Sequence, residues 1–426
     1  MALDDNTDVD AKPDIDGFIK SRAGSEALAA PLSAEDWTLQ SMEEASPVKW
    51  NLAHTSWFYE TFVLAPYVDG YEPFHPVFGY LFNSYYNQVG DMHPRARRGM
   101  LSRPSREDVL AYRRHVTEAV VALAENASAA VAQEIAPLLA LGRAHEEQHQ
   151  ELLLTDLKHG FYQNPLLPAA YEANDGSSPT SHAAATGEQW IDMEGGLVEI
   201  GAAPGQFSFD NEGPRHKVYL KPFGIAAAPV SNRQFQEFID DGGYRDPRWW
   251  LADGWALVQA EGWRAPLYWD PAANRRFSLF GEVDIDPDAP VCHVSFYEAA
   301  AYAEWTGFRL PSEFEWEHAA GDAPRVGNLL DPARPREPAA PSSVGGLAQL
   351  FGDVWEWTAS PYTAYPGYRA APGAIGEYNG KFMSSQMVLR GGSCATPIGH
   401  IRASYRNFFP PNARWQYSGL RLARDY

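Results

Sequence analysis

The stretch His-Glu-Glu-Gln-His at residues 145–149 has the spacing of a metal-binding pair. Residues four apart lie on one face of a helix, with their Cβ atoms about 5–6 Å apart, so His145 and His149 can bind one metal ion. The same letters fit the H-E-x-x-H pattern of zinc proteases, in which the glutamate activates water. The glycine and third histidine of the longer protease pattern are absent, because QELLLTDLKH follows. The motif alone leaves both metal binding and a structural histidine pair open.

A third ligand has to come from another part of the chain. His159 lies ten residues beyond His149 and, in one continuous helix, about 15 Å further along the axis, too far to share the metal. His54 is the better candidate, since it lies with Trp50 and Trp57 in an apolar helical run that we expect to face a bundle interior. A site of three histidines suits Zn(II) or Fe(II). A histidine that is only part of the core is the alternative for His54.

Several segments with helical spacing of apolar residues can position these histidines. They are 14–30, 35–66, 105–127 and 129–160. Together they predict a helical bundle. Residues 173–188 (ANDGSSPTSHAAATGE) are small and polar without periodicity, which predicts a linker. From 189 to 426 the chain is rich in Gly, Pro and Trp, and its few predicted helices include one with a capping box at Ser312 and one that begins at Ser231.

The composition indicates a globular protein that acts on small molecules. The length of 426 residues allows two or three domains, and the net charge of −21 disfavours nucleic acids and anionic membranes as partners. No stretch approaches the roughly 20 apolar residues that span a bilayer, and the acidic N-terminus lacks the apolar core of a signal peptide. We therefore expect a cytoplasmic protein. Cys292 and Cys394 are the only cysteines, which predicts two buried free thiols.

Longer stretches on both sides of the predicted linker resemble a known family. SPVKWNLAH (46–54), FNSYYNQVGDMHPRARRGMLSRPS (82–105) and HEEQHQELLLTD (145–156) resemble the DinB-like four-helix bundle of the ergothioneine-biosynthesis sulfoxide synthases. GGLVEIG, PVSNRQFQEFI, LFGDVWEWTASPY, VLRGGSC and GLRLAR resemble a formylglycine-generating-enzyme domain, a variant of the C-type lectin fold. The resemblance implies an α+β multidomain protein. Its expected parts are the bundle at 1–172, the linker at 173–188 and the lectin-like domain at 189–426.

In this family a mononuclear non-haem iron uses O2 to join the sulfur of a thiol to C2 of the imidazole of hercynine (Nα-trimethylhistidine), and the product is a sulfoxide. The resemblance therefore implies Fe(II) as cofactor and hercynine, cysteine and O2 as substrates. Carried over by position, the iron ligands are His54, His145 and His149. Gln148 matches the glutamine that contacts the substrate imidazole, and Glu146 and Glu147 are expected to be solvated or supporting groups rather than a catalytic base.

Two further segments match substrate-binding positions of the family. Tyr85 and Tyr86 resemble the tyrosine pair of the branch that uses free cysteine, and a phenol can supply a proton or a hydrogen atom to a reacting oxygen. Arg95 matches the arginine that binds the carboxylate of the thiol substrate, for which a planar guanidinium is suited. Arg97 and Arg98 are expected to be surface or structural charges.

Asn407, Phe408 and Phe409 match the hercynine-binding segment of the family. A quaternary ammonium donates no hydrogen bond, so aromatic faces are suited to hold it. Packing between the domains is the alternative for Phe408 and Phe409. Glu44 and Asn51 stand where the family commonly has aspartate and histidine, and these departures leave the sulfur donor open.

Alternatives to the cysteine-dependent reaction remain. A selenoneine-type synthase would use the same iron and hercynine with a selenium-sugar donor. An ovothiol-type synthase shares a pattern met by His145, His149 and Glu151, although that family typically has an added methyltransferase domain. Formylglycine generation is not expected, because no second cysteine follows Cys394 closely. A metal-binding module without enzymatic activity is the alternative from another class.

Overall fold

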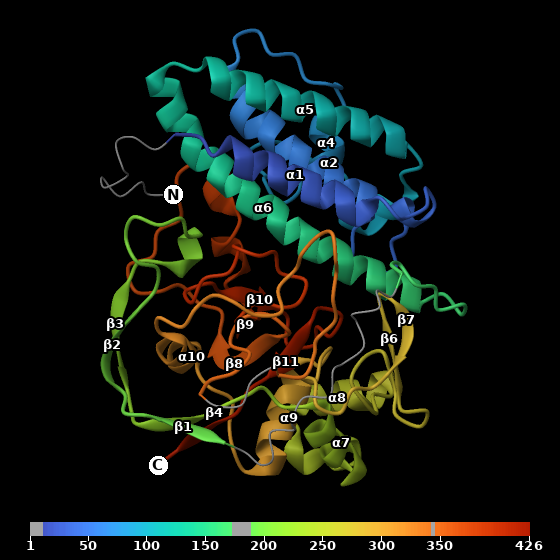
Figure 1. The fold of residues 1–426 in the computed structure, drawn as a ribbon, viewed down its shortest axis with the longest axis vertical. Coiled ribbons are helices and arrows are strands. Elements are labelled where there is room, and N and C mark those ends of the chain that lie inside the picture. The colour runs from blue at the N-terminus through green and yellow to red at the C-terminus, as the bar shows by residue number, and fades with distance from the viewer. Residues whose placement is uncertain (1–11, 173–188, 342–345) are drawn as a thin grey trace. The chain divides into compact units, whose positions relative to one another are not determined.

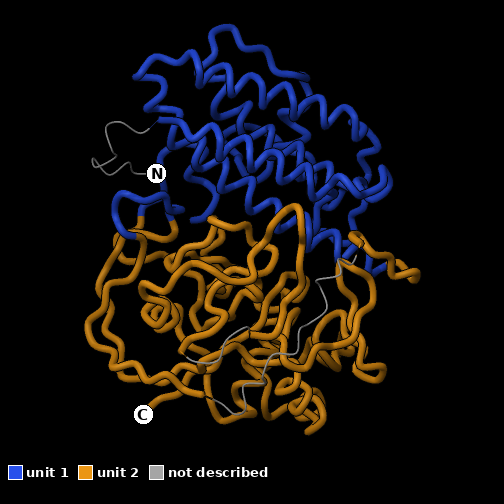
Figure 2. The backbone as a smooth tube through the Cα atoms, in the orientation of Figure 1, with its two compact units in different colours: residues 1–163, 203–210, 369–381 blue, residues 164–202, 211–368, 382–426 orange. Residues whose placement is uncertain are grey.

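The computed structural model describes residues 12–172, 189–341 and 346–426, which belong to two compact units (Figure 2). Unit 1 contains the chain up to Gln163 together with Ala203–Asp210 and Arg369–Lys381. Unit 2 contains Asn164–Ala202, Asn211–Tyr368 and Phe382–Tyr426. The predicted linker, 173–188, lies outside the described residues, and the domain boundaries at 172 and 189 stay predictions.

Long helices that run side by side make up most of the described part of unit 1 (Figure 1). They are α1 (Ile15–Ala29), α2 (Val48–Tyr59), α5 (Arg106–Asn126) and α6 (Ala129–Tyr162), with the short α3 (Ala65–Tyr67) and α4 (Phe78–Phe82) between α2 and α5. Asp14, Ser105 and Ser128 begin α1, α5 and α6, and each side chain accepts a hydrogen bond from a backbone N–H of the first turn. The predicted helical bundle is confirmed.

The helix expected over 35–66 is shorter than the apolar spacing predicted. Before Val48 the helical structure is limited to one 3₁₀ turn, Asp36–Thr38, and α2 begins only after Pro47. Proline lacks a backbone N–H and disfavours a helical conformation in the residue before it, which favours a helix that begins after Pro47 over one that runs through Ser46 and Pro47. Every residue of α2 is buried, which explains why its sequence has no polar face.

A buried ion cluster links the long helices of unit 1. Glu146 on α6 accepts hydrogen bonds from Arg22 on α1 at 3.0 Å and from Arg113 on α5 at 2.8 Å. Ser25 on α1 donates to the same carboxylate at 2.8 Å, and Arg113 donates to Thr55 on α2 at 3.0 Å. We call these five residues the Glu146 cluster. Because it joins α1, α2, α5 and α6, it fixes the part of α6 that carries the histidines.

Short strands and helices make up unit 2. Its sheets contain β1 (Trp190–Met193), β4 (Phe223–Ala226) and β12 (Ala423–Asp425); β10 (Asn407–Phe409), β9 (Met387–Arg390), β8 (Trp355–Pro361) and β11 (Ser418–Leu420); β2 (Gly196–Ile200) and β3 (His216–Leu220); and β5 (Trp269–Asp270), β6 (Arg275–Ser278) and β7 (Gly281–Asp284). The pairings between these strands are antiparallel except that of β11 with β8. The predicted α+β architecture, with helices preceding a mixed part, is confirmed.

The helices of unit 2 are α7 (Asn232–Asp240), α8 (Ala252–Glu261), α9 (Phe296–Thr306) and α10 (Glu313–Ala320). The capping box predicted at Ser312 begins α10, and the helix predicted to begin at Ser231 is α7, whose start also has a capping box. Cys292 and Cys394 are buried free thiols, which confirms that expectation. Among the described residues, we find no helix with both the length and the apolar character of a membrane span.

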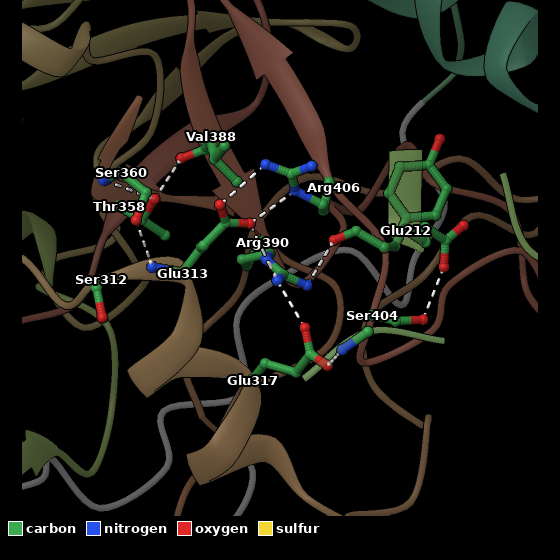
Figure 3. Close-up of polar contacts among 12 residues, drawn as sticks. Glu212, Ser312, Glu313, Glu317, Thr358, Ser360, Val388, Arg390, Ser404 and Arg406 are labelled. Carbon is green, nitrogen blue, oxygen red and sulfur yellow. Dashed lines mark hydrogen bonds and ion pairs between the residues drawn. The ribbon is translucent and has the colours of Figure 1, made fainter. Parts of the chain in front are cut away.

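A second buried ion network anchors β10 within unit 2 (Figure 3). Arg406, directly before β10, donates to the Glu313 carboxylate on α10 at 2.8 and 3.0 Å. Its third nitrogen donates to the Asn211 carbonyl at 2.9 Å. Arg390 at the end of β9 donates to Glu317 on α10 at 2.7 Å. The strand with Asn407, Phe408 and Phe409 is therefore held by buried ion pairs.

Candidate metal centre

His54, His145 and His149 meet inside unit 1. One ring nitrogen from each lies within 4.8 Å of the others, and the described residues contain no other group of three His, Cys, Asp or Glu side chains with such spacing. The ring centroids are 4.6–4.9 Å apart. The i,i+4 pair comes from α6 and the third ring from α2. His159 lies on the same unbroken α6 and pairs with Ser41 at 2.7 Å, so it is not part of the group.

Hydrogen bonds fix which ring nitrogens are free to bind a metal. Nδ1 of His54 lies 2.6 Å from the Phe82 carbonyl oxygen, which only accepts, so Nδ1 carries the proton and Nε2 keeps its lone pair. Nδ1 of His149 lies 2.8 Å from Oδ1 of Asn51. Nδ1 of His145 is buried without a hydrogen-bond partner. This donor set of neutral imidazoles, with a buried unpaired ring nitrogen, fits Fe(II) or Zn(II).

Burial keeps the three imidazoles neutral. It lowers the pKa of His145 to about 4 and that of His54 and His149 well below the ordinary value, and the proximity of His145 lowers the latter two further. A protonated imidazole has no lone pair for a metal, whereas the neutral ring does. The group is therefore in the binding protonation state at neutral pH.

Aromatic rings surround the histidines. The His54 ring stacks on Trp50 at 4.5 Å and on Trp57 at 5.4 Å between centroids. Phe58 lies 4.9 Å from the His145 ring. These rings hold the imidazoles in place by packing and lower the local dielectric constant, which strengthens electrostatic interactions at the group.

Glu146 does not have the position of a protease base. Burial would raise the pKa of its carboxyl, but Arg22, Arg113 and Ser25 outweigh that effect and hold the pKa at about 2. Its oxygens are occupied by the Glu146 cluster. Glu147 lies 3.9 Å from Arg143. The expectation that Glu146 supports the site rather than acting as a base agrees with this geometry, although the side chain is buried and not solvated.

The tyrosine pair lies beside the aromatic surroundings of His54. The buried Tyr86 ring contacts Trp57 at 5.5 Å and Phe62 at 5.3 Å. Tyr85 has a φ of 63°, in the left-handed region that such a residue rarely adopts, and its hydroxyl accepts a hydrogen bond from Arg95. Backbone strain of this kind is common at functional sites. Tyr85, Tyr86 and Arg95 are therefore brought together as one group.

Sequence reasoning missed Tyr378. This tyrosine belongs to the Arg369–Lys381 segment of unit 1, and its ring lies 6.2 Å from Tyr85 and 6.5 Å from Tyr86. Glu377 accepts a hydrogen bond from the Gln88 N–H at 3.2 Å, and Lys381 donates to the Tyr85 carbonyl. Burial raises the pKa of Tyr378 to about 12. No motif in GEYNGKF marks this tyrosine; only the fold identifies it.

The remaining predicted residues lie in two places. Gln148 is half-buried on α6 beside His149. Asn407, Phe408 and Phe409 form β10 of unit 2 and are half-buried. Phe408 stacks on Tyr362 at 4.1 Å, and Phe409 meets the edge of Trp415 at 5.7 Å. Their substrate-binding roles stay predictions.

Comparisons with known proteins agree with this architecture. Residues 18–154 match the DinB superfamily, and residues 176–331 and 330–426 match the sulfatase-modifying factor enzyme 1-like domain. The chain is 38% identical over 317 residues to a hercynine oxygenase of Mycolicibacterium smegmatis, covering 67% of this chain and 71% of that one. It is 35% identical over 414 residues to a hercynine oxygenase of Mycolicibacterium thermoresistibile, covering 89% and 87%. A formylglycine-generating enzyme of Mycobacterium tuberculosis is 31% identical over 233 residues, covering 43% and 76%.

Proposed function

Since the chain belongs to the hercynine oxygenase family, whose members are oxidoreductases, we propose that it is an Fe(II)- and O2-dependent sulfoxide synthase. It would join the sulfur of cysteine to C2 of the hercynine imidazole. The observation that carries the proposal is the group of three neutral histidines on α2 and α6, of which His54 and His145 are buried and His149 is half-buried.

His54, His145 and His149 would hold the iron. Bound Fe(II) would supply O2 activation and a binding position for the thiolate. Three neutral ligands leave the charge of the ion uncompensated. That charge would favour the thiolate over the protonated thiol in a substrate bound beside the three histidines.

Arg95 and Gln148 are proposed to orient the substrates. The guanidinium of Arg95 donates to the Tyr85 hydroxyl and the Glu44 carbonyl, while its buried Nε has no hydrogen-bond partner. An Nε donor that is already desolvated favours a carboxylate, because such a group forms a charge-assisted hydrogen bond. Gln148 would contact the imidazole of hercynine.

The trimethylammonium group of hercynine is assigned to Asn407, Phe408 and Phe409. The aromatic faces of β10 can attract a cation that donates no hydrogen bond. The buried ion pair of Arg406 with Glu313 keeps that strand in one conformation, so little ordering is needed on binding.

Tyr86 and Tyr85 are proposed as proton or hydrogen donors. Burial raises the pKa of Tyr86 well above its ordinary value, so the phenol keeps its proton at neutral pH. The hydroxyl is then available to the reacting oxygen. Trp57 and Phe62 pack against the Tyr86 ring and help to exclude water from the reaction.

The test is iron loading under anaerobic conditions, followed by exposure to O2 and mass spectrometry of the products. With hercynine and cysteine, we expect a hercynyl-cysteine sulfoxide. Parallel reactions with γ-glutamylcysteine and with a selenium sugar identify the donor. A product formed only from the selenium sugar would instead support the selenoneine-type activity, and histidine as the sole acceptor would support the ovothiol type.

The ligand assignment is tested with His54→Ala, His145→Ala and His149→Ala. Each variant should lose stoichiometric Fe(II) while circular dichroism still reports the helices. His159→Ala is the matched control, since this histidine is on α6 but pairs with Ser41, and it should retain iron. Stoichiometric iron in His54→Ala would contradict the three-histidine site.

A further inference from the structure

The side chain of Asn51 is hydrogen-bonded to one of the three histidines, His149. Its Oδ1 lies 2.8 Å from Nδ1 of His149. The two ends of an amide resemble each other, but here the orientation is determined, because Nδ2 faces the carbonyls of Ser46 at 3.2 Å and Pro47 at 3.4 Å. Carbonyl oxygens only accept, so the NH2 end must point to them. Oδ1 therefore faces the imidazole, and Nδ1 of His149 must donate.

The side-chain amide of Asn51 is held in place by its position on α2 and by Ser46, which is itself bonded to α6. Asn51 lies in the first turn of α2, three residues before His54, so one helix provides a histidine and the support for another. Ser46, which accepts from Asn51, also donates its N–H to Asp156 on α6 at 2.8 Å. Its hydroxyl accepts from Arg98 at 2.8 Å. Asn51 is only 2% exposed, so water has little access to compete for His149.

The chemical nature of this support matters. Metal-bound histidines usually donate their second N–H to a carboxylate, a backbone carbonyl or water, and a carboxylate raises the basicity of the ring. Here His54 donates to a backbone carbonyl and His149 to a side-chain amide. Both acceptors are neutral. A metal held by these two rings would therefore receive no negative charge through them.

We propose that Asn51 is a positioning residue for the metal, which sets the tautomer and orientation of His149 with a neutral acceptor. This inference rests on the metal-binding part of the proposed function. Its first consequence holds without any metal: His149 carries its proton on Nδ1, and Nε2 is free. Its second is that bound iron keeps a higher reduction potential than a carboxylate at position 51 would allow.

The tautomer can be measured in the metal-free protein by ¹⁵N NMR with labelled histidine. We expect the Nδ1–H form for His149 in the wild type. In Asn51→Leu, which keeps apolar volume without the acceptor, His149 should shift toward a mixture of tautomers. His54 should be unchanged, because its partner is the Phe82 carbonyl. An Nε2–H tautomer of His149 in the wild type would overturn the proposal.

Metal binding supplies the second readout. Fe(II) or Co(II) titration should show an affinity loss of about 10–100-fold in Asn51→Leu, the usual effect of removing such a partner. Asn232→Leu is the control for loss of a buried amide, since Asn232 in unit 2 is 4% exposed and bonds the Asp286 carbonyl. It should lose stability but not metal affinity. Equal losses of metal affinity in the two variants would contradict a specific role of Asn51 and would mean that it contributes only packing.

Asn51→Asp tests the charge and remains informative if the leucine variant fails to fold. It keeps an acceptor for His149, so the Nδ1–H tautomer should persist, and the reduction potential of bound iron should fall. An unchanged potential with a retained tautomer would contradict the neutral-acceptor argument. Failure of the proposed function gives a different pattern, namely correct tautomers and metal affinity without any product from hercynine.

Discussion

Adjacent residues of one helix have opposite roles at this site. His145 and His149 point toward His54, whereas Glu146 points to Arg22 and Arg113. Successive residues of a helix are about 100° apart around the axis, so neighbours face different parts of the bundle. The sequence predicted the histidine pair from the i,i+4 spacing. It could not show that two arginines surround Glu146, because they come from α1 and α5.

Removal of the Tyr86 hydroxyl tests its proposed chemical role. Tyr86→Phe keeps the ring that packs on Trp57 and Phe62, so iron and substrates should still bind. Without the O–H, oxidation of cysteine to its sulfinic acid should increase relative to sulfoxide formation. The measurement is the product ratio per O2 consumed, and Tyr85→Phe is examined in parallel. Tyr112→Phe, whose hydroxyl donates to Glu60 at 2.7 Å, is the control. An unchanged ratio in Tyr85→Phe/Tyr86→Phe would remove both phenols from the chemistry.

Asp156 should make stability depend on pH. Burial raises the pKa of this carboxyl from 3.8 to about 7, although the Ser46 N–H, Arg95 and Arg98 act in the opposite direction. The folded protein therefore keeps a proton that the unfolded chain releases. This contribution to stability is full below pH 3.8 and is lost as the pH rises through about 7.

Asp156→Asn removes this titration and keeps an oxygen for the Ser46 N–H. We expect the free energy of unfolding of the wild type, relative to the variant, to fall by about 2–3 kcal/mol between pH 5 and 8.5. Urea unfolding at a series of pH values gives this difference and cancels the titration of other groups. Parallel curves for the two proteins would show that Asp156 titrates normally.

Helix α2 shows what can and cannot be predicted about an element. The apolar run around His54 predicted a buried helix, and the whole of α2 is buried. Its start at Val48 follows from Pro47, yet the apolar spacing extends further back and suggested a longer helix. The sequence also could not identify the hydrogen-bond partner of His54, because the Phe82 carbonyl belongs to another helix, α4. Spacing predicts a face of a helix, whereas the contacts of that face depend on the fold.

The Glu146 cluster should contribute strongly to the stability of unit 1. In Glu146→Gln, Arg22 loses its ion-pair partner and Arg113 keeps only the ion pair with the partly exposed Glu26 at 3.1 Å. Removal of one partner from a buried ion pair typically costs about 3–5 kcal/mol. Urea or guanidinium unfolding of the iron-free protein measures the loss. Glu147→Gln is the control, since its contact with Arg143 is 3.9 Å long and partly exposed, and it should change stability by less than about 1 kcal/mol. Similar values for the two variants would contradict the structural role of Glu146.

Each of the two units is made of segments that are not consecutive along the chain. Ala203–Asp210 and Arg369–Lys381 belong to unit 1, although unit 2 provides the chain on both sides of each segment (Figure 2). The Arg369–Lys381 segment brings Tyr378 to the Tyr85 and Tyr86 rings. Neither helical periodicity nor a motif predicts such an assignment, because the segment contains only short 3₁₀ turns. Contacts between distant parts of the chain determine it.

Two polar contacts attach the Arg369–Lys381 segment to the part of the chain around Tyr85 and Tyr86. Their removal tests the importance of the segment. Glu377 accepts from the Gln88 N–H, and Lys381 donates to the Tyr85 carbonyl. In Glu377→Ala/Lys381→Ala we expect unchanged iron affinity and a stability change of at most about 1 kcal/mol, since such exposed contacts contribute little. Proteolysis within 369–381 should become faster, and kcat should fall because Tyr378 is no longer held against the pair.

Arg369→Ala is the matched control, because this residue is an exposed charge of the same segment. Its proteolysis rate and kcat should equal those of the wild type. If the double variant is cleaved faster but keeps its kcat and product ratio, the segment has only a covering role. If cleavage is also unchanged, the two contacts do not attach it. A fall in kcat with constant iron affinity would instead show that catalysis depends on a part of the chain that the histidine motif could not reveal.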